Sequence, residues 1–196
     1  MNNLNVKNIA IFASGAGSNA ENIIQFFKNS ASGKVKIVFC NVANAYVVTR
    51  AANLGVPCMV FSKDDFYNSN KLINKLLEEK IDWIILAGFL WLVPKNITEL
   101  YGNRIINIHP ALLPDYGGKG MYGDNVHKAV IANGAKESGI TIHYVNDKYD
   151  DGDIIFQAKC EITDADTPET LAEKVHALEY EYFPKIIESI LLMNEK

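Results

Sequence analysis

The chain has 196 residues, a length that one hydrophobic core can serve, so we expect a single domain over residues 1–196. Its 48% hydrophobic and 21% charged residues exclude intrinsic disorder, and a net charge of -4 provides no broad positive field for nucleic acid or anionic lipid. The polar start and the lack of an apolar run of ~20 residues argue against a signal peptide and a membrane span. We therefore expect a cytoplasmic protein without nucleic-acid or membrane partners.

The first half of the chain alternates short β-branched runs with longer segments of helical period, which indicates βα units around a parallel sheet. Each strand is a nearly continuous apolar run, as expected when helices cover both faces. The predicted strands are Ile9–Ala13, Val35–Asn41, Cys58–Phe61, Trp83–Ala87 and Arg104–Ile108. The predicted helices are Asn19–Asn29, Ala45–Leu54, Asp65–Lys80 and Lys95–Tyr101.

The pattern changes after Ile108, where prolines and glycines concentrate and predict a long loop of the kind that usually carries function. Thr167 as N-cap and Pro168 at the first helical position open a last helix, which we expect Pro184 to kink or interrupt. Before it come a predicted helix and a β-hairpin: Asp124–Asn133, Gly139–Asn146 and Ile154–Ile162. The prediction is a single-domain, Rossmann-like open α/β sheet, mostly parallel, with an antiparallel C-terminal hairpin and a final helix.

A glycine-rich segment, Ser14–Asn19, lies between the first predicted strand and the first predicted helix. Glycines permit a tight turn there, and the free N–H groups at the start of the helix suit a phosphate. The spacing is neither G-x-G-x-x-G nor that of a P-loop, which argues against NAD and ATP. A plain strand-to-helix turn with Ser18 as the helix cap is an equally good interpretation of this motif alone.

Asn107 and His109 stand at the end of the fifth predicted strand, the edge at which open α/β sheets bind ligands. Alternation along the strand puts both side chains on the same side. An amide next to a group that titrates near neutrality could hold a carbonyl and the oxyanion that it becomes. A structural histidine at a strand end is the alternative.

The turn Asp147–Asp153 contains four carboxylates, so we expect at least one of them to have a raised pKa or an important partner. The alternatives are a solvated hairpin turn and a calcium-binding loop. A calcium loop is disfavoured, because its twelve-residue ligand pattern is missing. The sequence also shows no nucleophile motif and no metal-ligand spacing among its histidines and cysteines. We therefore expect a metal-free reaction that is catalysed by positioning of the substrates, general acid–base catalysis and stabilisation of an oxyanion.

Read together, these motifs resemble the folate-dependent formyltransferase family over nearly the whole chain. The matching segments are S-G-x-G-S-N at Ser14–Asn19, L-A-G-F at Leu86–Phe89, I-N-I-H-P-A-L-L-P at Ile106–Pro114 and G-I-T-I-H-Y-V-N-D-K-Y-D-D-G at Gly139–Gly152. The resemblance is closest to the members that act in purine synthesis. It implies transfer of a formyl group from the co-substrate 10-formyltetrahydrofolate to the amine of glycinamide ribonucleotide, by direct attack without a covalent enzyme intermediate or metal.

By this resemblance Asn107, His109 and Asp150 form the catalytic trio. Asp150 is chosen over Asp151 because it stands two places before Gly152, as in the family's D-x-G pattern. Asn107 and a protonated His109 would stabilise the oxyanion, and Asp150 would keep His109 charged and take up or relay the proton of the amine. The phosphate and ribose of the substrate would be held by Gly17, Ser18, Asn19 and Glu179.

The resemblance also implies a folate site, formed by Leu90, Trp91, Leu92, Val93 and the turn at Asp147. Trp91 departs from the family, because many relatives carry arginine there. The loop 115–123 departs as well, since it is longer than the family's K-Y-P-G type of loop. Further candidate anion contacts are Lys63, for phosphate, and Lys119, for phosphate or the glutamate tail of folate, with solvated lysines as the alternative.

Several alternatives stay open within and outside the family. Methionyl-tRNA formyltransferases and formyltetrahydrofolate deformylases carry an extra domain that we do not expect in this chain. Sugar-nucleotide formyltransferases are disfavoured by the G-S-N segment, which fits a simple phosphate. A non-catalytic nucleotide-binding module is the alternative from another class, and in such a module the predicted trio would have no reason to converge. We expect small-molecule substrates and a monomer or homodimer.

Overall fold

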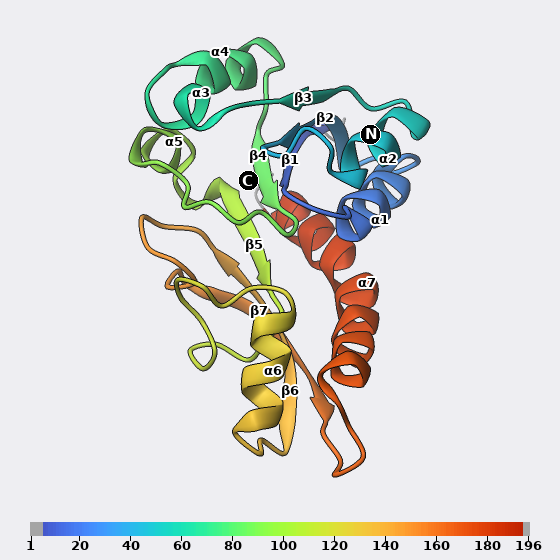
Figure 1. The fold of residues 1–196 in the computed structure, drawn as a ribbon. Coiled ribbons are helices and arrows are strands. Elements are labelled where there is room, and N and C mark those ends of the chain that lie inside the picture. The colour runs from blue at the N-terminus through green and yellow to red at the C-terminus, as the bar shows by residue number, and fades with distance from the viewer. Residues whose placement is uncertain (1–5, 194–196) are drawn as a thin grey trace.

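A computed structural model describes residues 6–193 and shows a seven-stranded sheet in the order β3-β2-β1-β4-β5-β6-β7 (Figure 1). The strands from β3 to β5 run parallel, and β6 and β7 are antiparallel to their neighbours. This confirms the predicted open, mostly parallel sheet with its antiparallel C-terminal hairpin. The strands are β1 (Lys7–Ala13), β2 (Gly33–Cys40), β3 (Cys58–Val60), β4 (Trp83–Leu86), β5 (Ile105–His109), β6 (Glu137–Tyr144) and β7 (Ile154–Glu161).

Helices cover both faces of the sheet and bury two hydrophobic clusters. One cluster lies under α1 (Ser18–Phe27), α2 (Tyr46–Asn53), α6 (Asp124–Ala132) and α7 (Pro168–Met193). The other lies under α3 (Lys63–Tyr67), α4 (Lys71–Glu78) and α5 (Lys95–Tyr101), and a short 3-10 turn, η1 (Gly102–Arg104), leads into β5.

Strand β1 shows why its sequence is apolar at every position. Ile9 and Ile11 belong to the cluster under α1 and α7, whereas Ala10 and Phe12 belong to the cluster on the opposite face. Side chains alternate between the two faces of a strand, so a central strand covered on both sides needs apolar residues throughout. The cluster around Phe12 is aromatic, and its ring stacks on that of Phe39 with 4.7 Å between the centroids.

The predicted helix Asp65–Lys80 is wrong, because the chain forms two helices there. α3 begins with a capping box. The Ser62 hydroxyl accepts from the Asp65 N–H at 3.1 Å, and the Asp65 carboxylate accepts from the Ser62 N–H at 2.9 Å. The chain then leaves the helix over residues 68–70, where the Ser69 hydroxyl donates to the Asp65 carbonyl. Short polar side chains offer the backbone such alternative hydrogen bonds, and the apolar period continues across the break without revealing it.

The prediction that Pro184 kinks or interrupts the last helix is wrong in its stronger form, since α7 is assigned as one helix from Pro168 to Met193. Proline has no N–H to donate, which would leave the carbonyl of Tyr180, four residues earlier, without its helical partner. The Asn22 side chain of α1 donates to this carbonyl at 2.9 Å. A neighbouring helix thus satisfies the carbonyl, and burial of the Pro184 ring offsets part of the remaining cost.

The antiparallel pairing of β5 with β6 decides which side chains meet at the edge of the sheet. Asn107 lies opposite His143, and His109 lies opposite Thr141. The carboxyl ends of β1, β4 and β5 lie beside this pair, so their following loops surround it. Within residues 6–193 no helix is both long enough and apolar enough to cross a membrane.

Candidate active site

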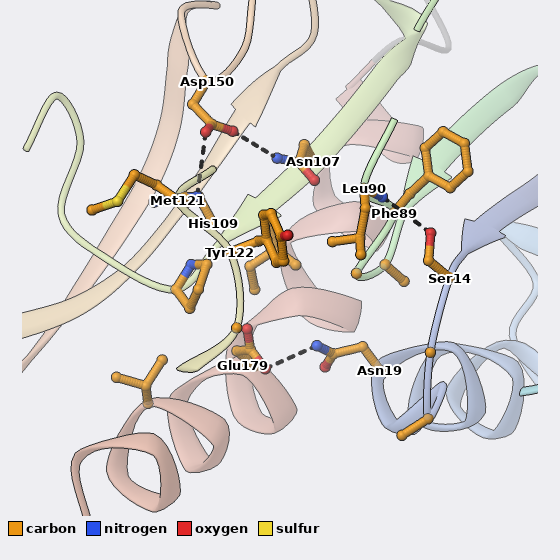
Figure 2. Close-up of a pocket in the computed structure, with 18 of the residues that line it drawn as sticks. Ser14, Asn19, Phe89, Leu90, Asn107, His109, Met121, Tyr122, Asp150 and Glu179 are labelled. Carbon is orange, nitrogen blue, oxygen red and sulfur yellow. Dashed lines mark hydrogen bonds and ion pairs between the residues drawn. The ribbon is translucent and has the colours of Figure 1, made fainter. Parts of the chain in front are cut away.

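A cavity of about 650 Å³ opens at the carboxyl ends of β1, β4 and β5. Its size is within the range typical of small-ligand sites. Segments far apart in the sequence line it: the glycine-rich segment after β1, the loop after β4, the end of β5, the loop before α6, His127 of α6, the turn between β6 and β7, and one face of α7 (Figure 2). Ser14 ties two of these segments together, because its hydroxyl accepts from the Leu90 N–H at 3.1 Å and its own N–H donates to the Gly88 carbonyl.

The glycine-rich segment leaves the start of α1 open toward the cavity. Gly17 is the N-cap with a φ of 76°, and no side chain caps the helix. The alternative interpretation, a plain turn with Ser18 as the helix cap, is therefore wrong about the cap, since Ser18 is already the first helical residue. The first hydrogen bond of the helix runs from the Glu21 N–H to the Gly17 carbonyl at 2.9 Å. The N–H groups before Glu21 have no intrahelical acceptor and create a positive end suited to an anion.

Gly17 cannot be replaced without strain. A Cβ on Gly17 would overlap the side chain and backbone of Val47 in α2, and its φ of 76° is one that residues with a side chain rarely adopt. The close approach of α2 is fixed by a hydrogen bond from the Val47 N–H to the Gly15 carbonyl at 3.2 Å. Two features of the backbone thus require glycine at this position.

Asn19 and Glu179 form a buried polar pair on the same side of the cavity (Figure 2). The Asn19 amide donates to Oε2 of Glu179 at 2.9 Å, and Nδ1 of His176 lies 2.9 Å from the same oxygen. Glu179 is 7% exposed. Both contacts use Oε2, so within residues 6–193 the other carboxylate oxygen of Glu179 is left for a ligand. The four residues expected at phosphate and ribose all line this cavity: Gly17, Ser18, Asn19 and Glu179.

The structure brings Asn107, His109 and Asp150 together at the opposite wall of the cavity (Figure 2). The Asn107 amide nitrogen donates to Oδ1 of Asp150 at 3.4 Å. Nδ1 of His109 lies 3.6 Å from Oδ2 of Asp150. Asp150 reaches this position through a positive φ of 52°, in the turn between β6 and β7. The β5 strand supplies two of the three groups and this turn supplies the third.

His143 is a fourth polar member of this cluster, and the sequence analysis did not identify it. Its Nε2 accepts from the Asn107 amide nitrogen at 3.0 Å and lies 3.7 Å from Oδ1 of Asp150. Its Nδ1 donates to the carbonyl of Tyr144 at 2.8 Å, which fixes the tautomer. The signal that identifies His143 is the register of the β5–β6 pair, because cross-strand partners share a face of the sheet.

Burial controls the charge of His109. The ring is 3% exposed, and its burial lowers the pKa of His109 despite the opposing effects of the Asp150 carboxylate and the Tyr116 carbonyl. Burial thus opposes the charged His109 that was expected beside Asp150, and its protonation during the reaction stays a prediction. In the neutral ring Nε2 donates to the Tyr116 carbonyl at 2.8 Å, and Nδ1 faces Asp150 without a proton.

Asp150 remains ionised in this setting. Burial alone would raise its pKa, but its contacts with His143 and His109 and the N–H of Gly118 outweigh burial and lower the pKa of Asp150 below its ordinary value. The carboxylate in the acidic turn thus has important partners, as expected, although its pKa is lowered and not raised. Its neighbour Asp151 is exposed and pairs with Lys148 at 3.3 Å.

The long loop after β5 contacts the trio directly. The Tyr116 carbonyl accepts from His109, and the Gly118 N–H donates to Oδ2 of Asp150 at 2.9 Å. Lys119, Met121 and Tyr122 from the same loop line the cavity. The loop therefore forms part of the cavity wall in addition to connecting β5 with α6.

The residues expected around folate divide into two groups. Leu90 lines the cavity and is 42% exposed. Trp91, Leu92, Val93 and Asp147 do not line it. Trp91 packs against the aromatic cluster on the other face of the sheet, with its ring 5.9 Å from that of Phe66, and Val93 is buried in the same cluster.

Lys63 also lies away from the cavity. Its ammonium is 5.8 Å from the centroid of the Trp91 ring, whereas Lys119 lines the cavity and is exposed. Among residues 6–193 no three histidine, cysteine, aspartate or glutamate side chains are close enough to hold a metal ion.

The open sheet has an uncapped helix start and an acid–base cluster in one cavity, and comparison with known proteins gives its class. Residues 7–187 match the formyl transferase family, and the chain belongs to that family. The chain is 38% identical to the chloroplastic phosphoribosylglycinamide formyltransferase of Arabidopsis thaliana over 94% of its own length, but it spans only 65% of that relative. It is 35% identical to the phosphoribosylglycinamide formyltransferase of Bacillus subtilis, covering 97% of this chain and 98% of that one.

A solved structure agrees with these relatives. The phosphoribosylglycinamide formyltransferase of Anaplasma phagocytophilum superposes with a TM-score of 0.87 at 31% identity, over 97% of this chain and 90% of that one. The fold described above is therefore shared across the family.

Proposed function

We propose that this protein transfers a formyl group from 10-formyltetrahydrofolate to the amine of glycinamide ribonucleotide, a step of purine synthesis. The observation that supports this most is the convergence of Asn107, His109 and Asp150 on one cavity that also contains the open end of α1. The names of the relatives from Arabidopsis thaliana and Bacillus subtilis support it independently. The protein acts on these small molecules in the cytoplasm as one formyltransferase domain, in a monomer or homodimer.

The ribonucleotide binds with its phosphate at the start of α1. The N–H groups of Ser18 and Asn19 and the positive end of the helix bind the phosphate, for which the net charge of -4 offers no general attraction. The free oxygen of Glu179 accepts from a ribose hydroxyl, and Lys119 is close enough to the cavity to add a positive charge. These contacts leave the amine of the substrate to point toward the trio across the cavity.

The trio supplies acid–base help and charge stabilisation. A neutral His109 next to an ionised Asp150 can accept the proton that the attacking amine must lose, held between Nδ1 and Oδ2. Once protonated, His109 is a cation that stabilises the negative charge developing on the formyl oxygen. The same proton then leaves on the folate nitrogen, so neither an enzyme nucleophile nor a metal is needed.

Asn107 organises this pair. Its amide nitrogen donates to both His143 and Asp150, so a role as oxyanion donor requires one of these hydrogen bonds to be exchanged for the substrate oxygen. The folate lies on the less polar side of the cavity, where Phe89, Leu90 and Met121 offer apolar surface. The other folate candidates would then affect folate binding only indirectly, by fixing the positions of the loops that line the cavity. These candidates are Trp91, Leu92, Val93 and Asp147.

The test is turnover with the purified chain. We expect release of tetrahydrofolate from 10-formyltetrahydrofolate only when glycinamide ribonucleotide is present, at a rate unchanged by EDTA. Formyl loss without acceptor would instead identify a hydrolase, and no reaction under either condition would refute the proposal. Activity lost in EDTA and restored by zinc would contradict metal-free transfer.

A further inference from the structure

His127 is a buried histidine in the cavity wall that has no role in the proposed formyl transfer. It lies in α6, is 6% exposed and lines the same cavity as Asn19 and Glu179. Its Nδ1 is sealed from solvent and has no hydrogen-bond partner, and within residues 6–193 its Nε2 has none either. Leaving a buried ring nitrogen without a partner is unfavourable, so its retention calls for an explanation.

A second residue of the cavity wall also carries an unpartnered polar atom. Oδ1 of Asn19 is buried without a hydrogen bond, although its amide nitrogen donates to Glu179. Two of the six buried side-chain polar atoms that lack a partner among the described residues thus belong to residues lining one cavity. A ligand can satisfy a buried side chain in a cavity wall that has no protein partner, so the ring of His127 indicates a ligand that supplies a hydrogen bond here.

We infer that His127 binds a sugar hydroxyl of the ribonucleotide through Nε2, the ring nitrogen that is not sealed from the cavity, beside the hydroxyl held by Glu179. The inference rests on the proposed function, since it names a further contact for the same substrate. It adds a residue from α6 to a site otherwise built by α1 and α7. His127 is a binding residue in this account and takes no part in the proton transfer at His109.

A hydroxyl fits this position better than the phosphate. Burial lowers the pKa of His127, with Glu179 and Asp124 opposing and His176 and His109 adding to the effect, so the ring is neutral at pH 7. A neutral ring offers no charge to an anion, and the Glu179 carboxylate nearby repels one. A hydroxyl can donate to or accept from either tautomer of the ring, so it satisfies Nε2 without a change of charge.

The test separates binding from stability. In His127→Leu an unpartnered polar ring is replaced by an apolar side chain of similar volume, so we expect the melting temperature of the ligand-free protein to be equal or higher. We expect the KM for glycinamide ribonucleotide to rise roughly tenfold, with kcat and the KM for 10-formyltetrahydrofolate unchanged. A histidine that served only the fold would show a lower melting temperature and an unchanged KM.

His127→Gln tests which atom is used, because the glutamine amide occupies nearly the place of Nε2. We expect it to restore most of the affinity that His127→Leu loses. Lys128→Gln is the matched control, since Lys128 is the next residue of α6 and is exposed. Both kinetic constants should stay at the wild-type value in this control.

Two simple probes assign the contact to the sugar. His127→Leu should weaken binding of ribose 5-phosphate in calorimetry and leave binding of inorganic phosphate unchanged. Equal weakening of both probes, or no weakening of either, would overturn the inference. If the wild type bound ribose 5-phosphate through His127 without any formyl transfer, the proposed function would fail and the hydroxyl contact would stand.

Discussion

The two ends of the cavity are built in different ways. The phosphate end is a local structure, in which one short segment between β1 and α1 presents backbone N–H groups around Gly17. The catalytic end is assembled from side chains of β5, β6 and the turn after β6, which lie up to 43 residues apart, as in the contact between Asn107 and Asp150. A local site depends on backbone conformation, whereas an assembled site depends on charges and strand register, so the two should respond to different substitutions.

The largest effect is expected at the assembled end. Asp150→Asn keeps the shape of the side chain but removes the carboxylate that shares a proton with His109. We expect kcat to fall roughly 10³-fold or more, while both substrates still bind, as measured by steady-state kinetics and calorimetry. Asp151→Asn is the matched control, because that neighbour is exposed and pairs only with Asn146 and Lys148 among the described residues. An unchanged kcat in Asp150→Asn would remove this carboxylate from the mechanism.

Gly17→Ala tests the local end. The added Cβ would overlap Val47, so the turn must shift and the N–H groups of α1 lose their alignment. We expect the KM for the ribonucleotide to rise ~10²-fold with little change in the folate KM, since a misplacement of about 1 Å has effects of this size. Gly55→Ala is the control, because Gly55 has a φ of 71° but open space around its Cβ position. The control should lose stability without losing affinity, and equal losses of affinity in both variants would contradict the phosphate site.

Glu179→Gln should have a smaller effect, on binding alone. The amide keeps most of the hydrogen bonding but loses the charge that strengthens contacts with Asn19, His176 and a ribose hydroxyl. We expect a roughly tenfold rise in the KM for the ribonucleotide, measured with saturating folate. Glu181→Gln, an exposed change two residues along α7, should behave as the wild type. A change confined to the folate KM would contradict the placement of Glu179.

The smallest effect is a dependence of stability on pH. Burial lowers the folded-state pKa of His109 and of His127 below 6.5, so below that pH the unfolded chain takes up protons that the folded chain does not. The free energy of unfolding should be highest above pH 6.5 and should fall as the pH drops toward the folded pKa values, by up to about 1.4 kcal/mol per pH unit for each ring.

Urea denaturation at pH 7.5, 6.5 and 5.5 measures this slope. His127→Leu should reduce it, since one of the two rings is removed. His176 acts in the opposite direction, because its hydrogen bond to Glu179 raises its pKa, but its side chain is half-exposed and its effect is smaller. A stability that rises as the pH falls from 7.5 to 5.5 would show that these rings are not buried in the neutral form.

The sequence predicted what is local and left out what depends on register. The strand–glycine–helix pattern at Ser14–Asn19 and the βα order followed from composition and period alone, and the resemblance led to Asp150. His143 did not emerge, because only the pairing of β5 with β6 puts it opposite Asn107. His127 did not emerge either, since a helical histidine on a buried face gives no sign of whether its nitrogens have partners.

Two predictions about helices were wrong, and the spacing of apolar residues could not reveal the cause of either. The apolar spacing in residues 65–80 continues through a polar break at residues 68–70, and the effect of Pro184 is offset by the Asn22 side chain from a distant helix. The expectation of a charged His109 rested on its neighbour Asp150 alone and left out burial. Its neighbour in the family pattern is a carboxylate, but its depth of burial is a property of the whole fold.

A double-mutant cycle tests the contrast between the two ends most directly. We predict that His109→Ala combined with Asp150→Asn lowers kcat no further than the more damaging single change, because the two groups share one proton. Gly17→Ala combined with Asp150→Asn should instead multiply the two single effects on kcat/KM. Multiplicative loss in the first pair, or strong coupling in the second, would contradict the account of one assembled acid–base unit opposite an independent phosphate site.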